Sequence, residues 1–345
     1  MISTTLLSLV RCPDCRGVLI DFICQGCGRR YEARANYLDM RPREQFTEQT
    51  KYLDEALHAD ARHERVSPPL LGSKIRNDML QSFLTPSSGE LVIDLGCGSG
   101  RTLLWNRDAG ATLVGIDISP FFSQDALRDV DLMLGDLRRL PFPDNTFDKA
   151  WSLDVLEHLS PEALEGMLSE ANRILKPGGA LFVYTHVRKN APIAVGLKWI
   201  NQLAKQLARW DLIDLRQEHL RKSDHLNPLQ DVPHLERVAS NTGFRIARIR
   251  FYTPIVGGFV ENIMMRVAER AMARRAAKRL ARSGAMGQDV DAAAVREART
   301  SAKEKIAKSP ATYATLRGLS FAMKLDLLLF GRVKSGPFFA LLVKR

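Results

Sequence analysis

Four cysteines near the start of the chain have the spacing of a metal site. Cys12-Pro13-Asp14-Cys15 and Cys24-Gln25-Gly26-Cys27 form two CxxC pairs with eight residues between them. Four thiolates suit a tetrahedral Zn2+, and a site closed by four protein ligands is structural because no position is left for water. The alternative is a pair of disulfides or redox dithiols. Disulfides are disfavoured because we expect a cytoplasmic chain, and two spaced pairs are not a thioredoxin pattern. We predict one structural Zn2+ held by Cys12, Cys15, Cys24 and Cys27.

A second group of residues could bring a cofactor to the end of a strand. The apolar run Val92-Ile93-Asp94-Leu95 is followed by glycines at alternate positions, Gly96, Gly98 and Gly100. Glycines remove the side chains that would block a close approach of the cofactor. A dinucleotide site would need its third glycine at position 101, where the chain has Arg101. The spacing therefore disfavours a pyrophosphate cofactor.

Two carboxylates follow at the ends of the next two predicted strands. Val114-Gly115-Ile116-Asp117 ends in an acid twenty-three residues after Asp94. A carboxylate in that place can accept both hydroxyls of a ribose. Gly135-Asp136-Leu137 then combines an acceptor for an adenine amino group with an apolar flank for the ring. Together the acids predict a nucleoside-containing cofactor.

These residues need a parallel sheet to bring them together, and the remaining pattern predicts one. Short apolar runs alternate with helical patterns, which indicates an α/β fold with helices on both faces of the sheet. The predicted strands are Glu90 to Leu95, Thr112 to Ile116, Val130 to Leu134, Phe147 to Leu153, Ala180 to Thr185, Arg245 to Tyr252 and Pro337 to Val343. Two mostly helical insertions, at about 187–227 and 255–336, interrupt the series.

The ordered motifs from 91 to 183, including Phe147 to Leu159 and Leu175 to Val183, resemble class I S-adenosylmethionine-dependent methyltransferases of the ubiquinone and menaquinone type. The resemblance implies a Rossmann-like, seven-stranded sheet whose last strand is antiparallel. It implies S-adenosylmethionine as cofactor, with the three glycines around its methionine part, Asp117 at the ribose and Asp136 with Leu137 at adenine. The other residues expected at the cofactor are Asp94, Ile118 and Leu153, although Asp94 could instead cap local backbone and Leu153 could be core.

The cysteine-rich segment resembles the short zinc ribbons that precede some bacterial methyltransferases and the ribbon proteins that activate transfer-RNA methyltransferases. We therefore expect a zinc ribbon over residues 1–45, a helical connector over 46–84 and a methyltransferase domain over 85–345. The resemblance is silent on the ribbon's role beyond structure, because such ribbons bind RNA, a partner or the adjoining domain.

The motif after the fourth strand restricts the methyl acceptor. Ser152-Leu153-Asp154 lacks the Asn/Asp-Pro-Pro-Tyr/Phe sequence of exocyclic amine methyltransferases, and there is no Pro-Cys nucleophile for a pyrimidine ring. Oxygen, carbon, sulfur and ring nitrogen acceptors remain. If the reaction needs a general base, His225 and His186 are the candidates, whereas His158 is interpreted as a packing residue.

The charge of the chain predicts an anionic partner. The formal net charge is +11, and twelve Lys or Arg face five Asp or Glu between Arg266 and Lys308. In that segment Arg266, Arg270, Arg274, Lys278 and Arg282 recur at steps of four, which is typical of a helix on an anionic membrane or of a solvated helix. Met1 to Val10 has no signal-peptide pattern, so we expect a cytoplasmic protein, peripheral at the inner membrane face.

The leading hypothesis is an enzyme that methylates a small, apolar or lipid-linked acceptor at that membrane face. An RNA methyltransferase acting on a ring nitrogen of ribosomal or transfer RNA, with the ribbon contacting RNA, is the first alternative; few aromatic residues accompany the basic run. An inactive, methyltransferase-like binding module is the second. The acceptor and the oligomeric state lie beyond what the sequence predicts.

Overall fold

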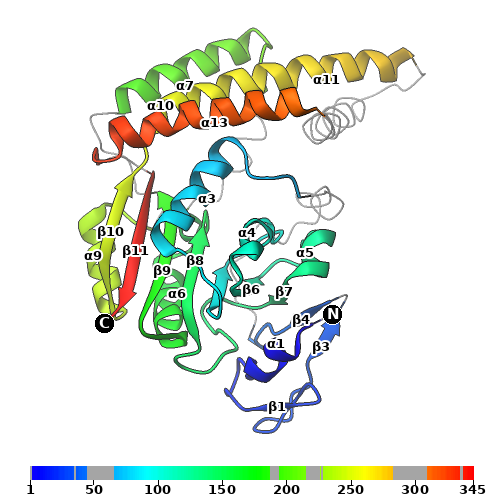
Figure 1. Cartoon of the computed structure of the whole chain (residues 1–345), viewed down its shortest axis with the longest axis vertical. Helices are drawn as coiled ribbons and strands as arrows, with labels where there is room; N and C mark the ends of the chain where they lie inside the picture. Colours follow the sequence, from blue (N-terminus) through cyan, green and yellow to red (C-terminus); the bar gives the residue numbers. More distant parts are fainter. Residues whose placement is uncertain are drawn as a thin grey trace.

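A nine-stranded mixed sheet forms the centre of the part of the chain that the structure describes (Figure 1). The computed structural model describes residues 2–34, 36–44, 66–186, 194–214, 226, 228–282, 309–334 and 337–345. The strands of the sheet are β3 (Glu32–Arg34), β4 (Tyr37–Asp39), β5 (Leu91–Leu95), β6 (Thr112–Asp117), β7 (Asp131–Leu134), β8 (Phe147–Leu153), β9 (Leu175–His186), β10 (Phe244–Phe251) and β11 (Pro337–Lys344). A separate hairpin consists of β1 (Leu19–Ile20) and β2 (Ile23–Cys24).

The topology confirms the predicted Rossmann-like α/β class. The strand order is β10-β11-β9-β8-β5-β6-β7-β4-β3, in which β5 to β9 pair in parallel. The last strand, β11, is antiparallel to both β9 and β10, as the resemblance implied. The seven predicted strands all form, and the largest difference is that β9 begins at Leu175 rather than at Ala180.

The predicted number of strands was too small, because the cysteine-rich segment contributes to the same sheet. Strand β4 lies parallel to β7, with Leu38 opposite Met133, and β3 forms the edge beyond it. The Met40 N–H then donates to the Leu134 carbonyl at 2.8 Å. Short, isolated runs such as Tyr37–Asp39 give no periodic signal, so the sequence did not predict the added strands.

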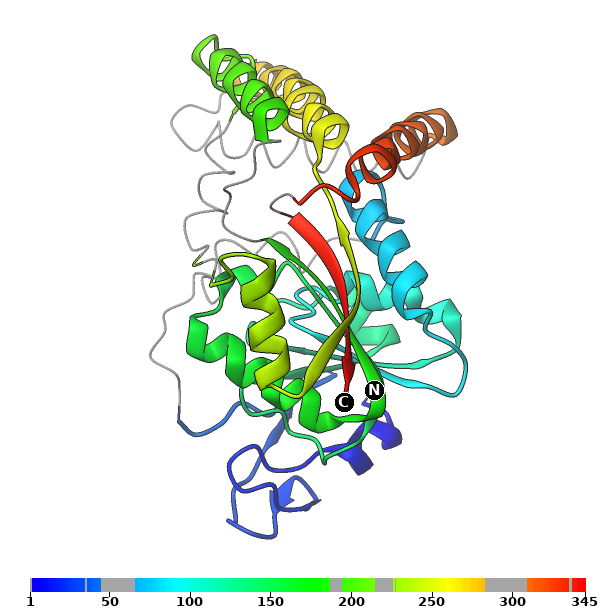
Figure 2. The same cartoon turned by 90° about the vertical axis from the view of Figure 1, so that its left-hand side faces the viewer.

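Helices cover the two faces of the sheet, and Figure 2 shows the sheet between them. One face packs against α6 (Pro161–Ile174) and α9 (Val232–Asn241). The other packs against α3 (Leu71–Leu84), α4 (Arg101–Asn106) and α5 (Gln124–Asp129). Successive strand residues alternate between these two cores, as Val92 and Ile93 do in β5, because side chains of a strand point to opposite faces. The remaining short helices are α1 (Thr4–Leu9), η3 (Arg107–Ala109) and η4 (Leu156–His158).

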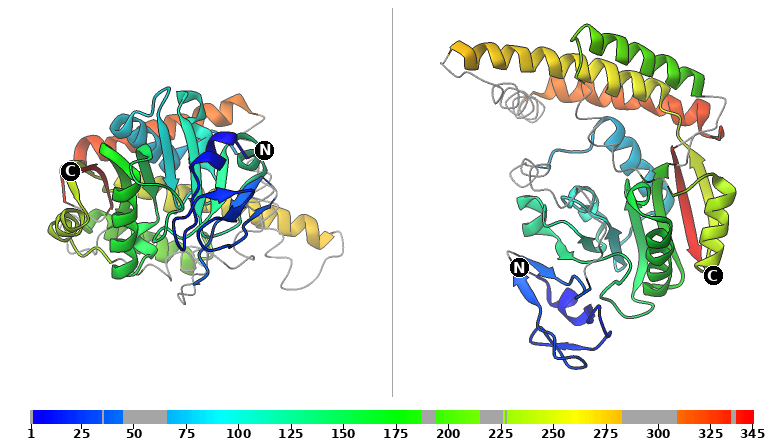
Figure 3. Two further views of the ribbon diagram at one scale, coloured as in Figure 1. Left: turned by 90° about the horizontal axis from the view of Figure 1, so that it is seen from below. Right: turned by 180° about the vertical axis from the view of Figure 1, so that it is seen from behind.

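The two insertions form a helical layer at the opposite end of the molecule from the cysteine-rich segment (Figures 1 and 3). Its elements are α7 (Ala194–Arg209), α10 (Ile255–Phe259), the π-helical turn η5 (Val260–Met264), α11 (Met265–Arg282) and α13 (Pro310–Phe330). The inner face of α7 packs on η5 through Ala204, Ile213 and Ile263. Within the described helices, none combines the length and the apolar character needed to cross a membrane.

The N-terminus of α3 is held by side chains of the second insertion. The side chain of its N-cap residue, Leu70, has no acceptor atom for the first N–H groups of the helix. Instead the Leu71 N–H donates to Ser320 Oγ at 2.7 Å, and the Gly72 N–H donates to Glu261 Oε1 at 2.9 Å. These contacts satisfy donors that every helix leaves open, and the Glu261 charge suits the positive end of the helix dipole. The insertion thus positions α3.

Helix α13 holds α10 in a similar way. Asp326 is fully buried, and its carboxylate accepts hydrogen bonds from the Val256 N–H at 2.9 Å and the Gly257 N–H at 2.7 Å. Lys324 of the same helix reaches Asp78 of α3 at 2.6 Å. Polar residues of α13 therefore point inward, where they join three helices of the cover.

Replacing Asp326 with alanine is expected to destabilise the protein by about 2–4 kcal/mol, because two buried N–H groups lose their acceptor. Asp326→Asn retains one side-chain oxygen and should cost less. The free energies of unfolding of both variants can be compared by urea denaturation. Equal stability of the alanine variant and the unaltered chain would show that this cap does not hold the cover together.

Candidate functional site

The loop from β5 to α4 contains the three glycines, and they play different parts. Their φ angles are 85° at Gly96, 54° at Gly98 and 80° at Gly100, all in the left-handed region. A Cβ on Gly96 would meet Val155 Cγ2 at 2.4 Å, and one on Gly100 would meet Ala126 Cβ at 2.6 Å. At Gly98 a Cβ would have nothing within 4 Å. Gly96 and Gly100 therefore permit close packing, whereas Gly98 borders the open space that a ligand could occupy.

Asp117 lies at the carboxyl end of β6, next to this loop. Its Oδ2 accepts from the Gly98 N–H at 2.7 Å and its Oδ1 accepts from the Ser119 N–H at 2.8 Å. Burial raises the pKa of Asp117, while the hydrogen bonds from Ser119, Gly98 and Ile118 oppose that rise. A carboxylate accepts about four hydrogen bonds, so these three N–H groups leave Asp117 one acceptor position. That position suits a hydroxyl donor.

Asp94 is the other acid beside the loop, and only 2% of it is exposed. Burial raises its pKa to about 8, and the negative charge of Asp117 acts in the same direction. An ordinary aspartate has a pKa near 3.8. Near neutral pH the Asp94 carboxyl is therefore largely protonated in the ligand-free protein, so a cationic ligand nearby would favour its ionisation.

This pKa makes stability depend on pH with a defined sign. Between about pH 4 and pH 8 Asp94 is protonated in the folded chain and ionised in the unfolded chain, so its contribution falls by about 1.4 kcal/mol per pH unit as pH rises. Asp94→Asn removes that term. The stability of the variant relative to the unaltered chain should rise by a few kcal/mol from about pH 5 to about pH 8, measured by denaturation of ligand-free protein. A difference that does not change with pH would contradict the assignment.

Asp136, the residue expected at the adenine of the cofactor, already accepts hydrogen bonds from within the protein. Asp136 forms a two-pronged ion pair with Arg138, whose Nε and Nη2 donate at 3.0 and 2.9 Å. The Arg138 N–H donates to the same carboxylate at 2.8 Å. Leu137 packs against the core, and the Met40 carbonyl lies 4.0 Å from where a Cβ on Gly135 would be. The cysteine-rich segment therefore borders this side of the site.

Leu153 and Ile118 are half-buried at the ends of β8 and β6. The residue after Leu153, Asp154, has a φ of 57° and lies 3.4 Å from Arg76 Nε. Val155 then packs on Gly96. The turn after β8 thus connects the glycine loop with α3.

Sequence reasoning missed a cluster on the far side of that turn. Arg76 of α3 lies over the ring of Tyr184 at 5.5 Å, and Tyr184 stacks on Phe339 at 4.7 Å. Tyr252 lies 6.0 Å from Phe339. Burial raises the pKa of the Tyr184 and Tyr252 hydroxyls, so neither is ionised at neutral pH. These residues come from α3, β9, β10 and β11, and only a single arginine in an otherwise ordinary amphipathic helix gave any signal for them.

The predicted bases are not tested by this geometry. His186 is the last residue of β9 and pairs with Pro337 of β11. His225 lies outside the described residues. Both stay predictions.

The four cysteines come together as predicted. Their sulfur atoms all lie within 4.8 Å of one another, and Cys12 to Cys27 and Cys15 to Cys24 are 3.7 and 3.3 Å apart. Tetrahedral zinc with Zn–S bonds of about 2.3 Å requires sulfurs about 3.8 Å apart, so the cluster fits the ion closely. The Tyr31 hydroxyl lies 3.0 Å from Cys12 Sγ, where it can orient a thiolate. No disulfide joins them.

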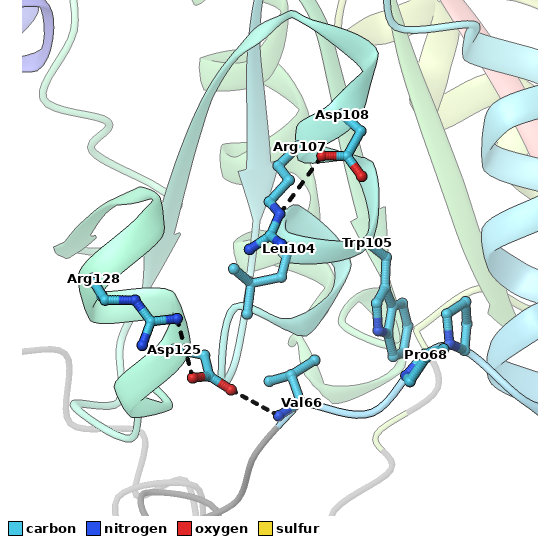
Figure 4. Close-up of a pocket in the computed structure, with 9 residues that line it drawn as sticks. Val66, Pro68, Leu104, Trp105, Arg107, Asp108, Asp125 and Arg128 are labelled. Atoms are coloured by element: carbon cyan, nitrogen blue, oxygen red, sulfur yellow. Dashed lines mark hydrogen bonds and ion pairs between the residues drawn. The ribbon is translucent and has the colours of Figure 1, made fainter. Parts of the chain in front are cut away.

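A surface pocket of about 480 Å3 lies elsewhere, along α4 and α5 (Figure 4). Trp105, whose indole N–H donates to the Ser67 carbonyl at 2.9 Å, forms part of its wall. Asp125 accepts from the Val66 N–H and pairs with Arg128 (Figure 4). None of its lining residues belongs to the glycine loop or to the strand ends that carry Asp117 and Asp136.

Comparison with known proteins assigns the central part of the chain. Residues 93–183 match the family described as "Methyltransferase domain". The chain contains a methyltransferase domain. The match runs from β5 to β9 and includes the glycine loop, Asp117 and Asp136, so the class predicted from the sequence is confirmed.

Curated relatives share this domain rather than the whole chain. A demethylmenaquinone methyltransferase of Tropheryma whipplei is 37% identical over 31% of this chain and 47% of its own length. A sterol 24-C-methyltransferase of Pneumocystis carinii is 37% identical over 30% of this chain and 29% of its own. The 27-O-demethylrifamycin SV methyltransferase of Amycolatopsis mediterranei is 28% identical over 42% and 57%. The match thus covers less than two thirds of each relative.

Among solved structures, the phosphoethanolamine N-methyltransferase 2 of Haemonchus contortus aligns with a TM-score of 0.48 at 17% identity, over 86% of this chain and 60% of that one. The strand order of the methyltransferase domain and its antiparallel last strand therefore rest on the pairing observed in this chain itself.

Proposed function

We propose that this chain transfers the methyl group of S-adenosylmethionine to a small, apolar or lipid-linked acceptor at or near a membrane surface. The observation that carries the proposal is the aromatic cluster beside the glycine loop. Tyr184, Tyr252 and Phe339 pack together at the end of the sheet that the second insertion covers. Arg76, which lies over Tyr184, is paired with Asp154. Tyr184 and Tyr252 are each 4% exposed and Phe339 is buried, so the cluster would form an apolar layer behind the acceptor rather than an open surface.

The residues around the loop fit the cofactor. Gly98 borders open space, and Asp117 keeps an acceptor position for a ribose hydroxyl. Asp136 and Leu137 would border adenine, with Asp136 using a lone pair that Arg138 leaves. When bound, S-adenosylmethionine supplies a methyl group on a sulfonium, and the protein mainly has to align the acceptor and exclude water.

The relatives support an acceptor of this class. Their names give a sterol, a demethylmenaquinone and a rifamycin as the molecules they methylate. Sterols and quinones with isoprenoid tails are largely apolar. The names give carbon for the sterol enzyme and oxygen for the rifamycin enzyme, so for this chain an oxygen, carbon or ring nitrogen acceptor stays open.

The cysteine-rich segment offers little free charge for RNA. Its arginines are largely used in ion pairs within the protein: Arg16 with Glu170, Arg29 and Arg43 with Asp14, Arg34 with Glu32, and Arg41 with Asp39. A phosphate would have to compete with these carboxylates. Its strand β4 also extends the sheet, which supports a structural role.

The test is to incubate the purified protein with methyl-labelled S-adenosylmethionine and cell extract, then separate lipid, RNA, protein and small metabolites. We expect label in the lipid extract, and none when the Asp117→Ala variant replaces the protein. Label in RNA would instead support the ring-nitrogen alternative. Cofactor binding by calorimetry with no label in any fraction would point to an inactive binding module.

A further inference from the structure

Helix α13 carries apolar side chains on both of its faces, because Leu316 and Met323 are buried and a second apolar set is exposed. Its buried residues include Ser320 and Asp326, which cap α3 and α10. Its outward face carries large apolar side chains: Phe321 is 73% exposed, Leu325 44%, Leu328 73% and Leu329 63%. Their spacing places them in one stripe along the helix. Among the described residues, packing accounts for the inner face of α13 but not for this outer stripe.

Cations surround this stripe. Arg317 lies one turn before Phe321, Arg332 lies one turn after Leu328, and Lys334 follows; all three are exposed. The only acid within α13 is Asp326, which is buried. The outward face of the helix is therefore both apolar and positively charged.

Helix α7, which lies in the same layer (Figure 1), carries a second set of this kind. Trp199 is 70% exposed and Leu203 44%, and their spacing places them on one side of the helix; Trp210, directly after the helix, is 61% exposed. The exposed cations next to them are Lys198, Lys205 and Arg209. Tryptophan favours the boundary between hydrocarbon and water, where its ring is buried and its N–H stays hydrated.

The basic row of α11, which the sequence suggested as the membrane contact, is partly used inside the layer. Arg270 and Arg274 both donate to Asp211, just after α7, at 2.7 Å, and Arg266 pairs with Glu269. The contacts with Asp211 join α11 to the end of α7. The most exposed apolar side chains of the described layer lie on α13 and at α7, whereas Phe259, Met264 and Val267 are 38–44% exposed.

We propose that the outward faces of α13 and α7 bind an anionic lipid bilayer in the plane of its headgroups. Such a surface accepts both features at once, since apolar side chains enter the acyl boundary and cations meet anionic headgroups. A second copy of this chain fits less well, because a symmetric contact would place the cations Arg317, Arg332 and Lys334 next to the same cations of the other copy. This inference rests on the proposed function, and it names the surface that would bring the enzyme to its acceptor.

The test uses flotation of the full chain with vesicles, without cofactor or acceptor. Vesicles of phosphatidylcholine and phosphatidylglycerol in equal parts should carry the protein, and vesicles of phosphatidylcholine alone should carry much less. Phe321→Glu combined with Leu328→Glu should weaken binding by more than about tenfold, and Arg332→Gln by about fivefold. These side chains are exposed, so circular dichroism should be unchanged.

The matched control is Val18→Glu combined with Ile20→Glu, which places the same two charges on apolar residues that are 51% and 58% exposed in the cysteine-rich segment at the opposite end of the molecule. It should bind vesicles like the unaltered chain. The proposal is overturned if the unaltered chain does not float with anionic vesicles, or if the α13 variant floats equally well. It is also overturned if sedimentation shows a dimer that the α13 variant abolishes, which would assign the face to a second copy.

This result is separate from the proposed function. Vesicle binding that α13 governs would stand even if label never entered lipid. Conversely, the α13 variant could label lipid as well as the unaltered chain does. That result would support the proposed reaction and contradict the proposed membrane surface.

Discussion

Replacing Asp117 with alanine is expected to weaken S-adenosylmethionine binding by about tenfold to a hundredfold. The carboxylate keeps an acceptor position after the Gly98, Ser119 and Ile118 N–H groups have bonded to it. A hydrogen bond to a charged group contributes about 1.5–3 kcal/mol, which corresponds to that loss. Isothermal titration calorimetry with the cofactor measures the change directly.

Two further variants make the result specific. Asp117→Asn keeps one oxygen acceptor without charge and should give an intermediate affinity. Asp108→Ala removes an acid of η3 whose side chain is 95% exposed, and should bind as the unaltered chain does. If Asp117→Ala keeps a normal circular dichroism spectrum and normal affinity, the cofactor does not contact the end of β6.

The same site gives a pH dependence whose sign follows from burial. Because the pKa of Asp117 is raised above its usual range, protonation begins at a higher pH than for an exposed aspartate. Protonated Asp117 loses acceptor positions and charge, so affinity should fall as pH is lowered and level off as pH rises. Asp117→Asn should not show this dependence.

The features that the sequence predicted correctly depend on short stretches of chain. Each parallel strand is a continuous apolar run, because both of its faces are buried, and the glycine loop follows β5 directly. The spacing of the four cysteines was enough to predict that their sulfur atoms cluster. In each case the signal lies within a few neighbouring residues.

What the sequence did not predict depends on contacts between distant segments. Arg76, Tyr184 and Phe339 meet because α3, β9 and β11 converge, and no local pattern marks them as a group. Asp326 and Ser320 lie in what reads as an apolar helix, yet they point inward because the ends of α3 and α10 need acceptors. Large apolar residues of α13 therefore also lie on its outer face. A rule that places apolar residues inside accounts for Leu316 and Met323 but not for the exposed stripe.

Removing zinc from the cysteine cluster is expected to have a large effect on the edge of the sheet. A structural site of four thiolates contributes on the order of 10 kcal/mol to the folding of its segment. Strand β4 pairs with β7, so an unfolded ribbon would expose the β7 edge that it covers. Cys24→Ser should lose the bound zinc, measured as about one ion per chain by atomic absorption, and should unfold at a lower temperature.

The region that loses protection from hydrogen exchange tests the structural interpretation more specifically than the fall in unfolding temperature does. Hydrogen exchange should speed up in β4 and β7 and stay slow in β8 and β9, which lie on the other side of β5. Ile20→Ser, an exposed substitution within the same segment, should keep its zinc and its stability. Because Met40 is bonded to Leu134 beside Gly135, the Cys24 variant should also bind S-adenosylmethionine more weakly through a loosened adenine side. If it loses zinc but keeps both its β7 protection and its affinity, the ribbon is an attached module rather than part of the sheet.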